Sequence, residues 1–151
     1  MTDAQISQHF SYAELTFSQT ALRKGINNDP PPEALENLRR LCTLILEPLR
    51  AFMGYPLHVD SGYRSALLNA AVGGASSSAH LEGRAADVIP IGLDLRTAFD
   101  IIRHSSLPFD QVIIECNAWI HVSVAPAGTD PRKEALLASG SAGNWHYEAV
   151  A

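Results

Sequence analysis

The sequence of 151 residues has few cysteines, few charged residues and no long apolar run. Its two cysteines, Cys42 and Cys116, fit neither a disulfide framework nor a zinc ribbon, and we expect two buried thiols. The formal net charge is −5, and the 11 basic residues form no cluster. A nucleic-acid partner and an anionic membrane surface therefore both lack their usual electrostatic footprint.

Targeting signals are also missing from the sequence. The first ten residues lack the basic and apolar segments of a secretory signal, and no apolar stretch approaches the length of a membrane span. We therefore expect synthesis in the cytoplasm without a signal peptide and no membrane partner. Hydrophobic residues make up 46% of the chain, which is ordinary for a globular protein, and the length suits one domain. We predict a single, monomeric domain over residues 1–151.

The apolar periodicity predicts an α+β fold, with helices packed on a small, mainly antiparallel sheet. Helices are expected over 33–53, 65–71 and 95–102, with a short one near 131–138, and strands over 57–60, 85–89, 111–115 and 119–124. Pro48 should kink the first helix or end it early. Residues 1–30 are predicted to form a docked arm, and residues 125–151 an Ala/Gly/Ser-rich tail. The apolar anchors of the arm would be Phe10, Tyr12, Leu15 and Phe17.

Candidate metal ligands concentrate between Ser78 and Asp87. His80 ends a loop of small residues, and Gly83 permits a tight turn before the next strand. Asp87 lies on that strand among apolar residues, where an acid is costly unless it is paired or bound to a metal. His121 is likewise a lone imidazole in an alternating strand. Two histidines and one aspartate suit Zn²⁺, and three ligands rather than four leave one coordination position for water.

Glu115 is the candidate general base. A short turn over 116–118 would pair the strands 111–115 and 119–124, so that Glu115 faces Trp119 and Ile113 faces His121. Glu115 and His121 would then be diagonal neighbours on one face, and the carboxylate could take a proton from a water molecule held between them. A slip of one residue in this register would place Glu115 on the wrong face.

Each residue of the metal pattern also has a simpler interpretation. A lone histidine in a strand is usually a hydrogen-bonded core residue, and Glu115 alone could be a surface charge at a strand end. Asp87 could be the ion-pair partner of Arg64 or Arg84. The joint pattern of the residues around Gly83 nevertheless favours a metal site.

Arg64 and Ser78 are candidate substrate-binding residues. The planar guanidinium of Arg64 is suited to gripping a substrate carboxylate or a developing oxyanion, which would make it a catalytic residue as well. The alternative is a structural salt bridge with Asp60 or Glu82. Ser78 could donate a hydrogen bond to substrate or simply form a turn. We also count Trp119, close to the last candidate ligand, as substrate-binding.

Four segments of the chain resemble the zinc D-Ala-D-Ala carboxypeptidase family of metallopeptidases, peptidase M15, in its short single-domain branch from phages and their bacterial hosts. The resemblance implies one Zn²⁺ per chain on His80, Asp87 and His121, with Arg64 and Ser78 near the substrate. The same segments are similar to the signalling domain of hedgehog proteins, which shares this fold and zinc site. The segments are residues 61–65, 69–74, 78–87, and 109–115 together with 119–123.

One position departs from the family pattern. Many relatives carry the catalytic acid three residues before the last histidine, where this chain has Ala118. Glu115 lies six residues before His121, as the acid does in the hedgehog-like spacing. Either Glu115 serves as the base, or the protein has lost its base.

The resemblance implies a zinc peptidase whose partners are peptidoglycan stem peptides. The bond cut would be D-Ala-D-Ala at a free C-terminus or an internal L-Ala-D-Glu bond, and the protein could be a phage lysin that reaches the cell wall upon lysis. The alternative is a catalytically weak or inactive zinc-containing module that binds wall peptide or a protein. A purely structural zinc domain of a phage particle is a third interpretation.

Overall fold

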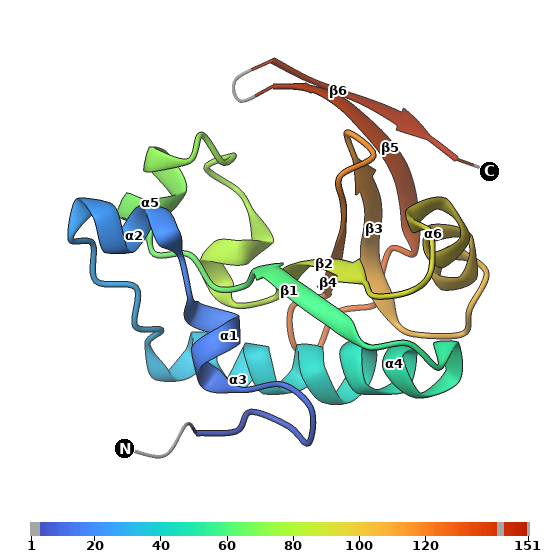
Figure 1. Cartoon of the computed structure of the whole chain (residues 1–151), viewed down its shortest axis with the longest axis horizontal. Coiled ribbons are helices and arrows are strands. Elements are labelled where there is room, and N and C mark those ends of the chain that lie inside the picture. The colour runs from blue at the N-terminus through green and yellow to red at the C-terminus, as the bar shows by residue number, and fades with distance from the viewer. Residues whose placement is uncertain (1–3, 142–143, 151) are drawn as a thin grey trace.

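The computed structural model describes residues 4–141 and 144–150, and in this part of the chain six strands form one sheet in the order β1-β2-β4-β3-β5-β6 (Figure 1). All neighbouring pairs are antiparallel except β3 and β5, which are parallel. The predicted α+β class with a mainly antiparallel sheet is therefore confirmed. The strands are β1 (Leu57–Ser61), β2 (Ala85–Pro90), β3 (Phe109–Glu115), β4 (Trp119–Val124), β5 (Glu134–Ser141) and β6 (Asn144–Ala149).

One long helical segment supports a face of the sheet (Figure 1). It comprises α3 (Pro32–Leu41), a π-helical turn η1 (Cys42–Leu46) and α4 (Glu47–Met53). We expected Pro48 to kink this helix or to end it early, but the helix continues past Pro48. The backbone N–H of Glu47 instead bonds to the carbonyl of Cys42, five residues back, and this wider turn accommodates the proline ring within a continuous helix.

The alternation of the central strands separates an apolar face from a polar face. Val88 of β2, Ile114 of β3 and Val122 of β4 belong to the hydrophobic core, which the long helical segment and α6 (Leu95–Arg103) cover. Burying each of these side chains contributes about 1.5–3 kcal/mol. Asp87 and His121 lie between such core positions, so their side chains point to the opposite face of the sheet.

The predicted helix near 131–138 is wrong. Residues 134–141 form β5, which extends the sheet beyond β3, and β6 pairs with β5. Glu134, Ala135 and Leu136 favour helices locally, but the open edge of β3 pairs with residues 134–138, and this tertiary pairing overrides the local preference. Ala135 and Leu137 then pack against the core. The last residue of the predicted tail and residues 142–143 lie outside the described residues.

The N-terminal arm contains α1 (Tyr12–Thr16) and α2 (Gln19–Lys24), and its residues 1–3 lie outside the described part. Phe10 and Leu15 are buried, as expected of anchors, and Tyr12 is half-buried. Phe17 is 58% exposed, so it does not anchor the arm. It lines the cavity described below instead.

The two cysteines were both expected to be buried, and only one of them is. Cys42 is a buried thiol as expected, whereas Cys116 is exposed because it lies in the turn between β3 and β4.

Within the described residues, no helix combines the length and apolar character needed to cross a membrane.

Candidate metal centre

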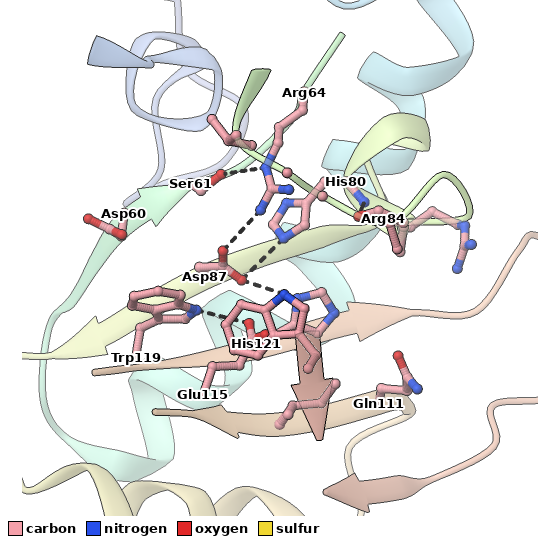
Figure 2. Close-up of a pocket in the computed structure, with 18 of the residues that line it drawn as sticks. Asp60, Ser61, Arg64, His80, Arg84, Asp87, Gln111, Glu115, Trp119 and His121 are labelled. Atoms are coloured by element: carbon pink, nitrogen blue, oxygen red, sulfur yellow. Dashed lines mark hydrogen bonds and ion pairs between the residues drawn. The ribbon is translucent and has the colours of Figure 1, made fainter. Parts of the chain in front are cut away.

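His80, Asp87 and His121 come together on the polar face of the sheet (Figure 2). One ligand atom from each lies within 4.8 Å of the other two, and all three residues are buried. Asp87 of β2 is directly opposite His121 of β4 in the antiparallel register, which brings their side chains to the same face. His80 approaches from the short 3-10 helix η2 (Ala79–Glu82).

The local sequence fixes the orientation of His80. Ser78 caps η2 by accepting a hydrogen bond from the His80 backbone N–H, and Gly83 ends η2 with a φ of +74°. A side chain at Gly83 would place its Cβ 2.3 Å from the carbonyl oxygen of Ala34, so glycine is required there. The ring Nδ1 of His80 donates to the carbonyl oxygen of Gly62 at 2.6 Å. The other ring nitrogen, Nε2, is then free to act as a ligand and faces Asp87.

Asp87 lies at the centre of the polar cluster. Its Oδ1 is 3.1 Å from Nε2 of His80 and 3.1 Å from Nδ1 of His121. Burial alone would raise the pKa of the Asp87 carboxyl, but the charge and hydrogen bonds of the two imidazoles hold that pKa well below its usual range. Asp87 is therefore a carboxylate at neutral pH, as a metal ligand must be.

Arg64 pairs with Asp87, which is one of the simpler interpretations considered above. Its Nη2 donates to Oδ2 of Asp87 at 3.3 Å, and its Nε donates to Oγ of Ser61 at 3.2 Å. Asp60 and Glu82 were the other expected salt-bridge partners of Arg64, and both expectations are wrong. Glu82 pairs with Arg84, and Asp60 forms no ion pair among the described residues.

Asn69 is a residue of this cluster that we had not named as functional. It is buried, its Oδ1 accepts from Nη1 of Arg64 at 3.0 Å, and its Nδ2 donates to the carbonyl of Ala75. A Cβ at Gly74 would lie 2.1 Å from Oδ1 of Asn69, so a side chain there would displace the Asn69 amide from Arg64. A buried asparagine in a short helix next to a glycine pair is a weak sequence signal. It links Arg64 to the loop that precedes His80.

The predicted register around Glu115 is confirmed. Glu115 is opposite Trp119 and Ile113 is opposite His121, so Glu115 and His121 are diagonal neighbours on one face. The indole Nε1–H of Trp119 donates to Oε1 of Glu115 at 2.9 Å (Figure 2). Oε2 of Glu115 has no such partner among the described residues, so it remains available to another group.

The metal cluster opens into a cavity of about 590 Å³. This volume is typical of a site for a small molecule or a short peptide segment. The cavity brings together all the residues predicted from the sequence as site residues, and it adds aromatic residues from β6 that we had not predicted. Its lining includes Arg64, Ser78, His80, Asp87, Glu115, Trp119, His121, Trp145 and Tyr147.

The donor set fits a divalent cation of the zinc type. Two imidazole nitrogens and one carboxylate oxygen converge, and His80 is oriented by a carbonyl in the way usual for metal-bound histidines. Arg64 balances the second oxygen of Asp87. Three protein ligands beside a cavity correspond to an open site rather than to a closed structural one.

Comparison with known families agrees with this geometry. A family model described as peptidase M15 matches residues 8–123. The chain belongs to the peptidase M15 family. No curated protein matches the chain. The suspected family is thus confirmed, and at family level this M15 domain is a metal-dependent peptidase with a His80–Asp87–His121 group that could bind a metal.

The M15 match ends before the C-terminal hairpin, which supplies the residues that we had missed. Trp145 and Tyr147 alternate with the polar residues His146 and Glu148, and this alternation is the signal of a strand with one aromatic face. Composition alone had suggested an Ala/Gly/Ser-rich tail. Only the pairing of β6 with β5 places that face over the M15 site.

Proposed function

We propose that this chain is a zinc-dependent peptidase that hydrolyses peptide bonds in the stem peptides of peptidoglycan. The observation that carries the proposal is the buried His80–Asp87–His121 group, which opens into a cavity bordered by Glu115 in a chain of the peptidase M15 family. Zn²⁺ held by these three residues, one ion per chain, would polarise the scissile carbonyl and acidify a water molecule.

Glu115 is proposed as the general base. Its carboxylate lies diagonally from His121, and its Oε2, which has no partner among the described residues, can accept a proton from the attacking water. The same carboxylate can then deliver that proton to the leaving amine. Trp119 holds Oε1 by its indole N–H, so that the carboxylate keeps one orientation toward the cavity. We therefore assign Trp119 a positioning role in addition to the substrate contact expected from the sequence.

Arg64 and Ser78 are proposed to contact the substrate. A guanidinium has five N–H groups, and Arg64 uses three of them on Ser61, Asn69 and Asp87. The two that remain can donate to a substrate carboxylate or to the developing oxyanion. The Ser78 hydroxyl accepts from the His80 backbone, which leaves its O–H free to donate.

Wall stem peptides are the proposed substrate class because the segments that hold the site resemble those of D-Ala-D-Ala carboxypeptidases. The bond would be D-Ala-D-Ala or an internal L-Ala-D-Glu bond. We propose that the protein meets this substrate after release from the cell in which it is made, as phage lysins do.

Digestion of purified peptidoglycan tests the proposal. We expect mass spectrometry to show pairs of new stem fragments whose masses sum to that of the parent plus one water, and no such fragments after a chelator has removed the metal. Readdition of Zn²⁺ should restore them. Intact stems in the presence of zinc-loaded protein would refute a peptidase acting on the cell wall.

The alternative function is a zinc-containing module that binds wall peptide or a protein without cutting it. The specific observation in its favour is Ala118, which stands where many relatives carry the catalytic acid. Binding of wall fragments without the appearance of new amines would support this alternative.

A further inference from the structure

The C-terminal strand β6 presents two aromatic side chains to the proposed active site. In the register of the sheet, Trp119 is opposite Glu115, Glu115 is opposite Ala138, and Ala138 is opposite Tyr147. Residues directly opposite one another share a face, so Tyr147 lies on the same face as Glu115. Trp145 is two residues from Tyr147 and therefore shares this face.

Both aromatic residues line the same cavity as the metal group. The only residue between Glu115 and Tyr147 in this row across the sheet is Ala138, whose small side chain leaves space above it. Burial raises the pKa of the Tyr147 phenol, and the negative charge of Glu115 raises it further, which agrees with their proximity. Tyr147 nevertheless remains 54% exposed, so a large part of its ring is uncovered.

Packing within the hairpin explains only part of this aromatic surface. The direct cross-strand partners are Gly140 for Trp145 and Ala138 for Tyr147. An aromatic ring over a glycine can stabilise a strand pair, and Trp145 is half-buried in keeping with such a role. Tyr147 is the more exposed of the two and has no large partner opposite it, so its ring is the better candidate for contact with a ligand.

The cavity also continues on the other side of the metal group. Asp60 and Ser61 of β1, together with Arg64, border that side, and Figure 2 shows them across Asp87 from Glu115 of β3, whose strand lies nearer to β6. The order of strands places β1 and β6 at the two edges of the sheet, with β2 and β4, which carry Asp87 and His121, between them. A peptide lying across the sheet would therefore meet Asp60, Ser61 and Arg64 on one side of the metal group and Trp145 and Tyr147 on the other.

We propose that Tyr147, with Trp145 beside it, forms a subsite that binds substrate residues beyond the scissile bond on the β6 side. The proposal rests on the peptidase function proposed above and deepens it. The enzyme would then act on an extended peptide in preference to a dipeptide. The ligand is a stretch of peptide with small apolar side chains, because aromatic rings provide apolar contact area while the phenol hydroxyl can bond to a peptide group.

Kinetics with two substrates test this subsite. The substrates are an extended stem peptide and a dipeptide that contains only the scissile bond. We expect Tyr147→Ala to raise KM for the extended peptide about tenfold, which corresponds to about 1.4 kcal/mol, and to raise it far less for the dipeptide. Tyr147→Phe should retain most of the affinity because it keeps the ring. The matched control is His146→Ala, because His146 is exposed on the opposite face of the same strand.

A binding measurement separates this inference from the peptidase proposal. Calorimetry with the extended stem peptide is carried out on zinc-loaded Glu115→Gln protein, with and without Tyr147→Ala. Weaker binding upon loss of Tyr147 supports the subsite, even if the native protein cuts nothing and the peptidase proposal fails. Equal KM values for native and Tyr147→Ala protein, or equal affinities in calorimetry, overturn the subsite, even if the peptidase proposal stands. Preference of the native protein for the dipeptide also overturns it.

Discussion

The metal-bearing strands and the C-terminal hairpin contribute to one cavity in opposite ways. Nearly every residue of β2 and β4 is buried, whereas β6 is exposed at all but one position of Asn144–Ala149. The first region holds ionisable side chains in fixed positions through hydrogen bonds to neighbouring elements. The second presents aromatic rings on an edge strand. Chemistry that depends on geometry thus occupies the rigid part of the sheet, and the proposed recognition surface occupies the part that tolerates change.

Replacing Asp87, the central candidate ligand, should have the largest effect on the metal-bearing strands. Asp87→Asn should abolish zinc binding and hydrolysis, because the amide lacks the charge that attracts the cation. It should also destabilise the fold by about 3–5 kcal/mol, since Arg64 would lose its buried partner. Metal analysis and thermal unfolding measure both effects. Asp130→Asn, in an exposed loop, is the control, and a variant that kept one zinc per chain would contradict the assignment of Asp87.

Glu115 lies on β3, between the metal-bearing strands and the C-terminal hairpin. A substitution at Glu115 should lower the rate of hydrolysis without affecting metal binding. We expect Glu115→Gln to lower kcat about 10²- to 10⁴-fold, the usual contribution of a general base, with one zinc retained. Single-turnover hydrolysis and metal content measure this separation. Full activity in the variant would exclude Glu115 as the base.

A variant of Trp119 tests whether its hydrogen bond orients the Glu115 carboxylate. Trp119→Phe keeps an aromatic ring but removes the N–H that binds Oε1, so we expect kcat to fall about tenfold, in line with one hydrogen bond to a charged group. The two tryptophans should give two indole N–H resonances in NMR spectra, which Trp119→Phe assigns. Glu115→Gln should move the Trp119 resonance more than that of Trp145. Equal movement, or none, would count against the bond.

The smallest effect concerns the attachment of the hairpin. Arg132, just before β5, donates hydrogen bonds to Asp110, and these bonds lower the pKa of the Asp110 carboxyl although burial opposes them. A lowered folded-state pKa means that the stabilisation is present above about pH 4, the unfolded value, and is lost as the pH falls through the folded value.

We expect Asp110→Asn to cost about 0.5–1 kcal/mol at pH 7, because Arg132 is largely exposed and the pair is screened by solvent. The difference in the free energy of unfolding between native and variant protein should be smaller at about pH 3 than at pH 7. Urea unfolding at both pH values measures it. A difference that is equal at both pH values would assign the effect to packing rather than to charge.

The metal group could be predicted because its signals are local. Asp87 and His121 each interrupt an apolar strand, and a three-residue turn fixes the register that brings Glu115 to their face. Several other features depend on partners remote in sequence. The helix-favouring residues 134–138 become a strand only because β3 has an open edge, and the ion-pair partner of Arg64 is Asp87, 23 residues further along the chain. The role of Tyr147 required both strand pairings of the hairpin.

The parallel pairing of β3 with β5 has a consequence for the order of folding. β3 and β4 are joined by a three-residue turn and can pair early, whereas Gln111 finds its β5 partner Glu134 only after the intervening chain has been placed. Loop closure over a longer segment costs more entropy and slows the step that requires it. We therefore expect β3 and β4, which carry Glu115 and His121, to pair first. The other pairings should follow, since Gln111 and Glu134 are 23 residues apart and Asp87 and His121 are 34 residues apart. The candidate metal group would then be completed only when β2 brings Asp87 to a pair of strands that already holds His121.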